Sequence, residues 1–421
     1  MAGMNGHRNG TRVVVTGMGA ITPIGNSVPE FWENALQGKS GIDILTQFDH
    51  SQYPIHIAGE VKNFDPQDHM DRRDARRMGR FSQFAVAGAR EALQQADLDL
   101  EKVDRTRVGV LFGNGIGGLP DTQAAVRTID NKGGMRIDPF FFPKMLPNMA
   151  AAHVSLIYGA KGYSNTVITA CAAGTQAIGD AMDLIRAGRS DVMITGGTEA
   201  SLVEVGLCGF AVIRALSTYD GDPHKASRPF DKERDGFVAA EGAGVFVLES
   251  LEHAQRRGAP ILAELAGYGA TNDANHVVAP CADGDGAMRA MTLALDDAGV
   301  QPEEVDYINA HATSTPLNDA SETVAIKRLF GEDAYRVPIS GTKSMVGHSF
   351  GAAGAVESVA TVQTVNTGMV HPTINYENPD PECDLDYVPN EARQADVHVA
   401  LKNSFGFGGH NACLVFKRFD G

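Results

Sequence analysis

The sequence predicts an α/β fold made of two similar halves, and the alternation of apolar segments is the main reason. Short apolar runs that are typical of buried strands alternate with longer segments of helical periodicity. This order occupies residues 1–258 and restarts over residues 259–421, without a linker long or polar enough to separate independent domains. Glycine, at 47 residues, gathers in short clusters beside the apolar runs, which indicates tight strand-to-helix turns.

The expected elements follow from the spacing of the apolar residues. Residues 12–16 form a valine-rich strand, and Gly17-Met18-Gly19 predicts that this strand stops in a glycine turn. In the first half, further strands are expected at 108–112, 165–170, 192–195 and 244–248, and helices at 30–38, 81–96, 172–186 and 251–257. In the second half, strands are expected at 261–268, 305–310, 398–401 and 412–416, and helices at 287–298, 321–329 and 352–366. The halves share no strict sequence repeat, so duplication is expected in structure only.

Charge and composition disfavour several classes of protein. The formal net charge of −16 argues against a general surface for nucleic acid or for anionic membranes. No run of roughly 18 apolar residues occurs, so no membrane-spanning helix is expected. Five cysteines without a CxxC pair argue against a disulfide framework or a zinc site and for a reducing compartment. Residues 1–9 lack the apolar core of a signal peptide, and a cytoplasmic protein is expected.

One basic segment interrupts the acidic background. Residues 71–80 contain five arginines, namely Arg72, Arg73, Arg76, Arg77 and Arg80. The segment is interpreted either as a solvated helix face with internal ion pairs or as a docking patch for an acidic partner.

The strongest chemical signal is a cysteine at the end of an apolar strand. Residues 167–170 lead into Cys171, and the small residues Ala172, Ala173 and Gly174 then begin a helix. This arrangement would place the thiol at a helix N-terminus, where the dipole and the free backbone N–H groups favour the thiolate. The alternative is a buried, inert cysteine that fills a small space.

Two histidines follow similar signals in the second half. His311 ends an apolar strand, and His348 lies where a glycine-rich turn meets a helix. Either histidine alone is more often a core or capping residue. Open α/β sheets nevertheless gather side chains at the carboxyl ends of their strands. A thiol with two imidazoles is suited to acyl transfer through an oxyanion or an enolate.

A fourth segment, residues 403–411, combines three glycines with two aromatic residues, Phe405 and Phe407. Its glycines predict either a flexible loop with aromatic lids or a tight hairpin whose aromatic residues belong to the core. Both interpretations remain open at this point.

Together, these four segments resemble the β-ketoacyl-[acyl-carrier-protein] synthases, most closely the elongating synthases of type II systems. The resemblance runs over nearly the whole chain and includes residues 228–231, 235–237 and 241–244. It implies a thiolase-like duplicated α/β fold with five layers, α-β-α-β-α, usually as a homodimer. It also implies fatty acid elongation, in which malonyl carried by acyl carrier protein extends an acyl chain by decarboxylative Claisen condensation. No metal or redox cofactor is expected for this reaction.

The resemblance assigns catalytic roles to residues of these segments. Cys171 would take the acyl group as a thioester, and its own backbone N–H and that of Phe407 would form the oxyanion hole. His311 and His348 would assist the loss of CO2 from malonyl and stabilise the enolate. Phe407 would also be the gate that admits malonyl only after acylation.

Supporting and binding positions are implied in the same way. Lys343, with Glu357, would hold the histidine region electrostatically. The positions that match the acyl pocket or the pantetheine arm are Ile116, Phe210, Phe405, Thr313 and Thr315, and Phe141 matches a residue that reaches the pocket of the other subunit. The positions that match contacts with the acidic carrier protein are Arg73, Arg76, Arg77 and Arg214.

Three positions depart from the family pattern and leave the substrate open. Ala312 stands where glycine is usual, His410 where threonine is usual, and Val278 where a pantetheine-binding threonine is common. Similar changes occur in actinobacterial-type long-chain synthases and in some polyketide ketosynthases. The alternative function is therefore a ketosynthase subunit of a type II polyketide or polyene pathway, paired in a heterodimer with a chain-length factor.

Other functions fit single motifs only. Residues 113–118 satisfy the dinucleotide pattern G-x-G-x-x-G, but Leu119 and Pro120 follow, and nucleotide binding is disfavoured. Ser349 satisfies the G-x-S-x-G pattern of serine hydrolases, but little of the chain remains beyond it. A thiolase would have a second cysteine near the C-terminal glycine segment, whereas Cys413 lies beyond it in a strand-like run. Chain-length factors lack the nucleophilic cysteine.

Overall fold

The computed structural model describes residues 10–421, so residues 1–9, which were expected to lack a signal peptide, lie outside the described part. Ten strands of this part form one mixed sheet. The first half supplies β1 (Val13–Ile21), β4 (Val108–Gly113), β5 (Ser164–Val167), β6 (Val192–Glu199) and β7 (Gly242–Ser250). The second half supplies β8 (Ala263–Asn272), β9 (Tyr307–Asn309), β10 (Ile339–Ser340), β13 (Val399–Gly406) and β14 (His410–Lys417). Two small ladders are β2 (Asp43–Ile44) with β3 (Ile57–Ala58), and β11 (Met369–Val370) with β12 (Arg393–Gln394).

The two halves form the same five-strand unit. In the first, β1 pairs antiparallel with β7 and β7 antiparallel with β6, while β6 is parallel to β4 and β4 to β5. In the second, β8, β14, β13, β9 and β10 repeat this order and these directions. The units meet where β1 pairs antiparallel with β8. The expected duplication is therefore present in the topology. The boundary at residues 258 and 259 falls between α9 and β8 and stays a prediction.

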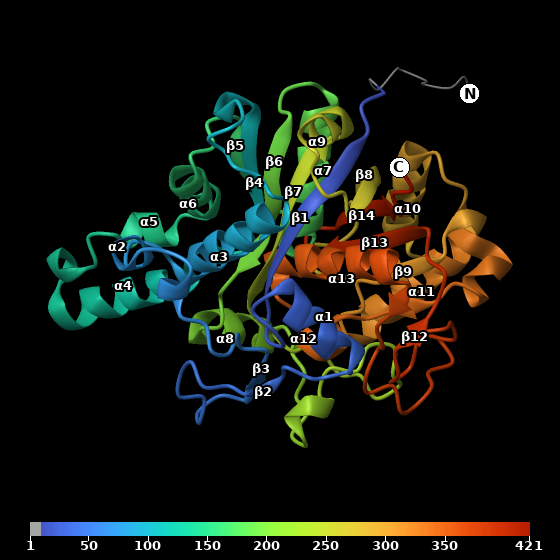
Figure 1. Ribbon diagram of the computed structural model, residues 1–421. Helices are drawn as coiled ribbons and strands as arrows, with labels where there is room; N and C mark the ends of the chain where they lie inside the picture. Colours follow the sequence, from blue (N-terminus) through green and yellow to red (C-terminus); the bar gives the residue numbers. More distant parts are fainter. Residues whose placement is uncertain (1–9) are drawn as a thin grey trace.

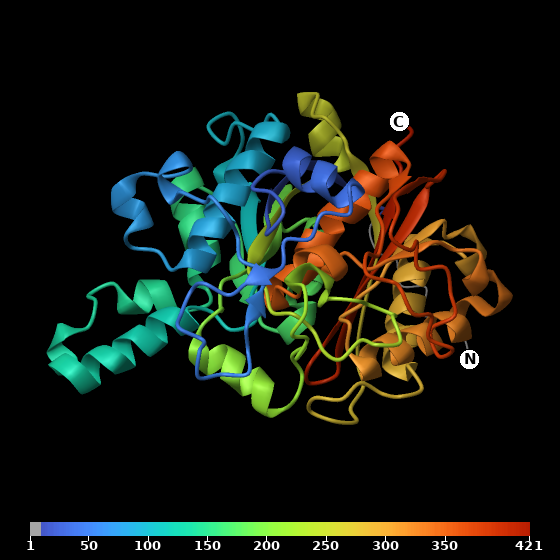
Figure 2. The same cartoon turned by 90° about the horizontal axis from the view of Figure 1, so that it is seen from below.

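The helices and the two strand units stack in five layers, as expected. On the outer face of the first unit lie α3 (Arg80–Gln95) and α6 (Met149–Tyr158), and α10 (Asp285–Ala298) and α11 (Pro316–Phe330) cover the second. Between the units lie α7 (Ala173–Arg186) and α13 (Ala353–Thr367), each of which contacts strands of both. Figure 1 shows α13 between α3 on one side and α10 and α11 on the other. From below, the blue-to-green first half and the orange-to-red second half lie side by side (Figure 2).

The remaining helices lie around these layers. They are α1 (Val28–Leu36), α2 (Arg72–Ala75), α4 (Leu119–Lys132), α5 (Phe141–Met145), α8 (Glu204–Val212), α9 (Leu251–Arg257) and α12 (Lys343–Val346). The helices expected from periodicity are found, whereas α4 and α6 were not expected. Within residues 10–421, no helix has both the length and the apolarity that are needed to cross a membrane.

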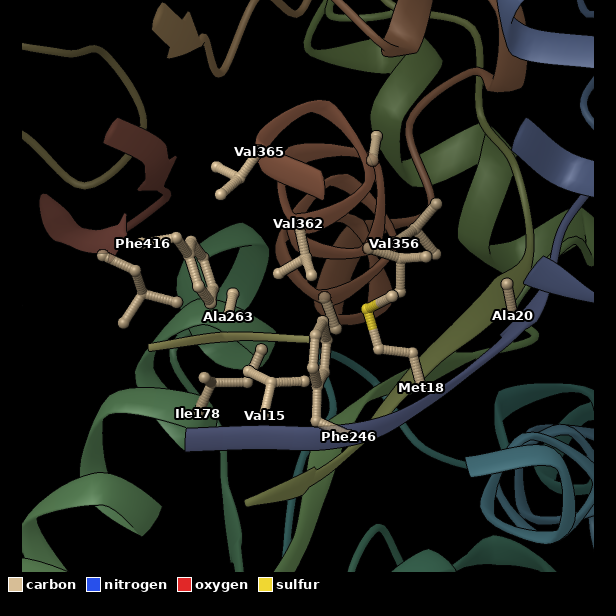
Figure 3. Close-up of a cluster of buried hydrophobic side chains, with 14 of the residues drawn as sticks. Val15, Met18, Ala20, Ile178, Phe246, Ala263, Val356, Val362, Val365 and Phe416 are labelled. Atoms are coloured by element: carbon tan, nitrogen blue, oxygen red, sulfur yellow. The ribbon is translucent and has the colours of Figure 1, made fainter. Parts of the chain in front are cut away.

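Apolar side chains of the middle layer hold the two units together. Val15 of β1 and Phe246 of β7 point toward Val356 and Val362 of α13 in Figure 3, and Phe416 of β14 approaches from the second unit. All five are at most 2% exposed. Burying side chains of this size stabilises a fold by about 1.5–3 kcal/mol each. This cluster therefore fixes the two central helices between the two five-strand units.

The predicted end of the first strand at Gly17 is wrong. β1 continues through Gly17 and Gly19 to Ile21, with a register shift between Val15 and Gly17. The glycines serve close packing instead of a turn. A Cβ atom on Gly17 would lie 2.0 Å from the Ala92 carbonyl oxygen, and one on Gly19 would lie 2.0 Å from that of Gly88, so α3 rests directly on the strand backbone.

A glycine of β7 makes a similar contact with α13, and its substitution should loosen the middle layer. A Cβ atom on Gly244 would lie 2.4 Å from the carbonyl carbon of Ala355. We therefore expect Gly244→Ala to lower the free energy of unfolding by about 1–3 kcal/mol, measured by urea denaturation. The matched control is Gly209→Ala in α8, where nothing lies within 4 Å and alanine should stabilise the helix by about 0.5–1 kcal/mol. A Gly244→Ala protein as stable as the unsubstituted chain would contradict this account of the packing.

Candidate active site

The three candidate catalytic side chains come from turns at the inner ends of the two units. Cys171 lies in the 3-10 turn Ala170–Ala172, between β5 and α7. His311 follows β9, and His348 follows α12 and precedes the 3-10 turn Phe350–Ala352 that leads into α13. The structure brings all three together as lining of one cavity of about 350 Å³.

Strained backbone accompanies each of these residues. Ala170, Ala312 and Phe350 have φ values of 49°, 46° and 46°, in the left-handed region where side chains other than glycine are disfavoured. Each lies within two residues of a candidate catalytic side chain. Such conformations cost about 1–3 kcal/mol each and persist where packing fixes them, typically at functional sites. The alanine at position 312, where the family usually has glycine, accepts this strain.

The thiol and one imidazole are in direct contact. His348 Nε2 lies 3.0 Å from Cys171 Sγ. Burial raises the pKa of Cys171 to about 11, although Lys343 and the backbone N–H groups of Phe407 and Cys171 itself act to lower it. The expected preference for thiolate at a helix N-terminus is therefore outweighed by burial. The thiol keeps its proton at neutral pH, and His348 is the neighbouring group that can exchange that proton.

His311 has a fixed tautomer. Lys343 Nζ lies 3.2 Å from His311 Nδ1 and donates to the His311 carbonyl oxygen at 2.5 Å. An ammonium has no lone pair, so Nδ1 is the acceptor and the ring proton is on Nε2. Burial, reinforced by the charge of Lys343, lowers the pKa of His311 well below 6.5, so the ring is neutral. His311 thus offers a neutral N–H donor.

The tautomer of His348, in contrast to that of His311, is not fixed by a neighbouring residue in the described part of the chain. Its Nδ1 is buried and has no hydrogen-bond partner among the described residues. No neighbour of the ring in residues 10–421 therefore decides which nitrogen holds the proton. Burial lowers the pKa of His348 well below 6.5 as well. The neutral ring can present either a lone pair to the Cys171 thiol or an N–H to an oxyanion.

Buried carboxylates hold the surrounding backbone. Glu357 pairs with Lys343, as expected. Glu322 of α11 accepts hydrogen bonds from the backbone N–H groups of His311 at 2.8 Å and Ala312 at 2.9 Å. Glu322 was not among the residues predicted from the sequence. Its one signal is a carboxylate on the buried face of the helix that follows the His311 segment.

Residues 403–411 form the tight hairpin of the two alternatives. β13 and β14 pair in register up to Gly406 and His410, and the turn contains Gly408 and Gly409 with φ values of 83° and 73°. The Gly408 N–H donates to the Val277 carbonyl oxygen at 2.9 Å, so a segment of the second half is tied to the turn. This geometry brings the Phe407 backbone N–H to the Cys171 sulfur.

Most of the predicted binding residues share the cavity with the catalytic side chains. Those that line it are Phe210, Arg214, Thr313, Thr315, Phe405 and Phe407, together with Val278. Phe350 also lines the cavity and stacks on Phe210 with ring centroids 4.9 Å apart. Phe350 and Phe237 had no predicted role, although both stand beside recognised motifs.

Two predicted pocket residues are not placed there. Ile116 and Phe141 are not among the described residues that line the cavity. Phe210, Phe237 and Phe350 pack against one another on the cavity wall. Phe141 begins α5, and its place in the partner subunit's pocket stays a prediction.

The arginine segment divides into two parts. Arg73, Arg76 and Arg77 line an open groove beside α2 that shares no lining residue with the cavity. Arg214 lies at the cavity instead. Arg80 is bound to the buried Glu241, with an ion pair of 2.8 Å, and is not part of the groove.

The rival motifs have structural roles. The Gly115 N–H in the G-x-G-x-x-G segment donates to Glu199 Oε2 at 2.7 Å, and burial raises the pKa of Glu199 to about 8. A carboxyl group thus occupies the place that a phosphate would need. Ser349 is 3% exposed and is not among the lining residues described. Cys413 is buried in β14, where its thiol donates to Asn403 Oδ1. In residues 10–421, no group of three or more His, Cys, Asp or Glu side chains is arranged to hold a metal ion.

Comparison with known proteins matches this geometry. Residues 10–254 match the N-terminal domain of the beta-ketoacyl synthase family, and residues 262–377 match its C-terminal domain. The chain is 52% identical over 409 residues to 3-oxoacyl-[acyl-carrier-protein] synthase 2 of Staphylococcus aureus (strain COL), covering 97% of this chain and 99% of that protein.

Solved ketosynthases have the same fold. A chain of the complex of a type II PKS acyl-carrier protein with its ketosynthase bound to the hexaketide superposes with a TM-score of 0.90 at 38% identity, covering 97% of this chain and 100% of that one. The ishigamide ketosynthase/chain length factor gives a TM-score of 0.90 at 38% identity, covering 97% and 99%. The expected thiolase-like duplicated fold is confirmed. The chain belongs to the beta-ketoacyl synthase family.

Proposed function

We propose that the protein is an elongating β-ketoacyl-[acyl-carrier-protein] synthase that acts in fatty acid synthesis. The observation that supports this most directly is the contact of Cys171 Sγ with His348 Nε2 at 3.0 Å, beside a second neutral imidazole, His311. The 52% identical relative is named for this activity. The cavity holds one nucleophile and two donors, which is what two successive acyl substrates require.

In the first half-reaction, Cys171 attacks the thioester carbonyl of an acyl-carrier protein. The sulfur–carbon bond forms, the carrier thiol leaves, and the Cys171 proton passes through His348 to the carrier sulfur. The backbone N–H groups of Cys171 and Phe407, which both interact with the Cys171 sulfur, are the proposed oxyanion hole. The product is an acyl group bound to Cys171.

In the second half-reaction, malonyl-carrier protein loses CO2. The electron pair of the broken carbon–carbon bond moves into a thioester enolate, whose oxygen accepts hydrogen bonds from His311 Nε2–H and from His348. The enolate carbon then attacks the carbonyl carbon of the Cys171 thioester. A carbon–carbon bond forms, the bond to Cys171 sulfur breaks, and the sulfur takes up a proton from solvent through His348. Neutral imidazoles suit this step because the enolate needs donors without a competing strong base. No metal or redox cofactor enters this scheme, and that expectation stays a prediction.

Acyl carrier protein is the proposed partner, and the relative's name and the solved complex support this choice. The exposed groove with Arg73, Arg76 and Arg77 and the separate Arg214 are the proposed contacts. A homodimer is also proposed. β5 is the end strand of the sheet, and the neighbouring Ile168, Phe142 and Leu156 are 56%, 61% and 74% exposed. A second copy could extend the sheet there and cover these side chains.

The alternative is a type II polyketide ketosynthase paired with a chain-length factor. The likeness to the ishigamide ketosynthase/chain length factor favours it, as does Val278 on the cavity wall. Co-purification separates the two cases, because a stable heterodimer supports polyketide synthesis and a homodimer supports fatty acid elongation. A cytoplasmic location stays a prediction.

The function is tested by following the acyl group. On incubation with acyl-carrier protein, we expect intact-mass analysis to show one acyl group on the protein. Malonyl-carrier protein should then release a β-ketoacyl product two carbons longer, and carriers of graded chain length would define the preferred substrate. Cys171→Ser should show neither event, whereas Cys281→Ser should show both. Acyl-enzyme in Cys171→Ser, or fluorophosphonate labelling of Ser349, would overturn the proposal.

Substitution of either histidine should impair decarboxylation of malonyl-carrier protein more than acylation of Cys171. We expect His311→Ala and His348→Ala each to slow CO2 release from malonyl-carrier protein by about a hundredfold or more, because the enolate loses a donor. Acylation of Cys171 should persist in part. The exposed His398 is a control, and His398→Ala should release CO2 at the normal rate. Normal CO2 release by both cavity variants would exclude their proposed role.

The arginine groove should act on binding of the carrier protein alone. Replacing Arg73, Arg76 and Arg77 together with glutamate should raise KM for acyl-carrier protein about tenfold or more, and added salt should shrink the difference. Activity with an acyl-pantetheine substrate that has no carrier protein should not change. The exposed Arg189→Glu serves as the matched charge reversal. Equal KM values for the triple variant and the control would argue against docking at this groove.

A further inference from the structure

Lys402 places a second buried ammonium behind the two histidines. Its side chain is 0% exposed on β13, and Nζ lies 2.8 Å from Glu357 Oε2 and 3.0 Å from Ser404 Oγ. Nζ also donates to the Asn403 carbonyl oxygen. An ammonium has three donors, and three oxygen atoms surround this one. The arrangement therefore favours the charged form, although burial acts to lower the pKa of Lys402.

Glu357 is shared between two lysines. Oε1 pairs with Lys343 and Oε2 with Lys402, and all three side chains are at most 1% exposed. One carboxylate balances one ammonium, so this cluster has a surplus positive charge. A further carboxyl, that of Glu322, accepts hydrogen bonds from the backbone N–H groups of His311 and Ala312, and burial raises its pKa. A buried surplus charge is unfavourable for folding, and such charges are concentrated at functional sites.

Lys402 also reaches the nucleophile helix. Ser404 Oγ, which contacts Lys402, lies 2.7 Å from Thr175 Oγ1 in the first turns of α7. The network thus runs from Lys343 behind His311, through Glu357 and Lys402, to the helix that follows Cys171. This placement gives Lys402 a route to act on the site without touching a substrate.

We propose that Lys402 is a positioning residue whose charge, together with that of Lys343, keeps His311 and His348 neutral while the enzyme works. The proposal rests on the proposed function only for the decarboxylation step. The titratable groups around the two imidazoles are Cys171, Lys343, Lys402, Glu357 and Glu322, and Arg214, Asp235, Asp273 and His276 line the same cavity. Of these, both lysines act to lower the pKa of both histidines. Lys343 also acts to lower the pKa of Cys171.

The sign of the effect follows from these contacts. A nearby cation disfavours imidazolium, so removing the Lys402 charge should raise the pKa of both histidines. Donors are lost as the rings protonate, so CO2 release should then fail at a higher pH than before. The same change should increase the share of thiolate–imidazolium in the Cys171–His348 pair, because that share grows with the histidine pKa. Removing the Lys402 charge should therefore slow decarboxylation at acid pH and speed the reaction of the Cys171 thiol.

The experiment compares Lys402→Met with the full-length unsubstituted protein. We expect the acid limb of the pH profile for CO2 release from malonyl-carrier protein to move up by about one pH unit. At pH 6.5, alkylation of Cys171 by iodoacetamide, followed by peptide mapping, should become about tenfold faster. Lys417→Met on β14, whose Nζ donates to the Ala298 carbonyl oxygen at the far end of the strand, should change neither quantity.

Three results would overturn the proposal. They are an unchanged pH limb with unchanged alkylation, a fall of both rates without a shift in pH, and a Lys402→Arg protein that behaves like Lys402→Met despite its retained charge. If Lys402→Met does not fold, Lys402→Gln, which keeps a donor for Ser404 and Asn403, is judged by the same criteria. If the unsubstituted enzyme releases no CO2, the proposed function fails, and the alkylation rates alone decide the role of Lys402.

Discussion

The site depends on the close approach of α7 and α13, which lie between the two five-strand units of the sheet. Each helix begins directly after a turn that holds a candidate catalytic group, so their spacing sets the distance between Cys171 and His348. Glycine makes that spacing possible. A Cβ atom on Gly174 of α7 would lie 2.8 Å from the Gly351 carbonyl oxygen, and one on Gly354 would lie 2.1 Å from Thr175 Oγ1. The apolar cluster around α13 then holds both helices in place, and the 3.0 Å contact follows.

Within this frame, the two histidines are not equivalent. Lys343 fixes the proton of His311 on Nε2, so His311 acts as a constant donor. His348 Nδ1 has no partner in the described residues, so His348 can change tautomer as the reaction proceeds. A two-step reaction needs both properties. One group must accept or return the thiol proton, and a donor must be present when the enolate forms. Burial serves both groups, since it lowers their pKa values and keeps the rings neutral.

Local signals in the sequence were sufficient for most strands of the large sheet, for the central helices and for the candidate catalytic residues. Cys171 and the histidines stand at ends of apolar runs, and the order of the motifs implied the fold. Contacts between distant segments could not be predicted in this way. Gly17 and Gly19 have the local signature of a turn, but α3 packs against them and β1 continues. The contacts of Glu322 and Lys402 with the site join α11 and β13 to distant segments, so no local pattern predicts them. Burial raises the pKa of Cys171, and the residues next to Cys171 in the sequence do not show how deeply the thiol is buried.

Ala170 and Phe350, which both have left-handed backbone conformations, occupy equivalent positions in two matching turns of the duplicated fold. Thr169-Ala170-Cys171-Ala172-Ala173-Gly174 and Ser349-Phe350-Gly351-Ala352-Ala353-Gly354 occupy the same place in the two units, each before a central helix. The counterpart of the nucleophile is therefore Gly351. A Cβ atom there would lie 2.2 Å from the backbone nitrogen of Gly115, so this turn has no room for a side chain. The duplicated fold therefore has two equivalent positions before a central helix, and packing leaves room for a thiol side chain at only one of them, Cys171.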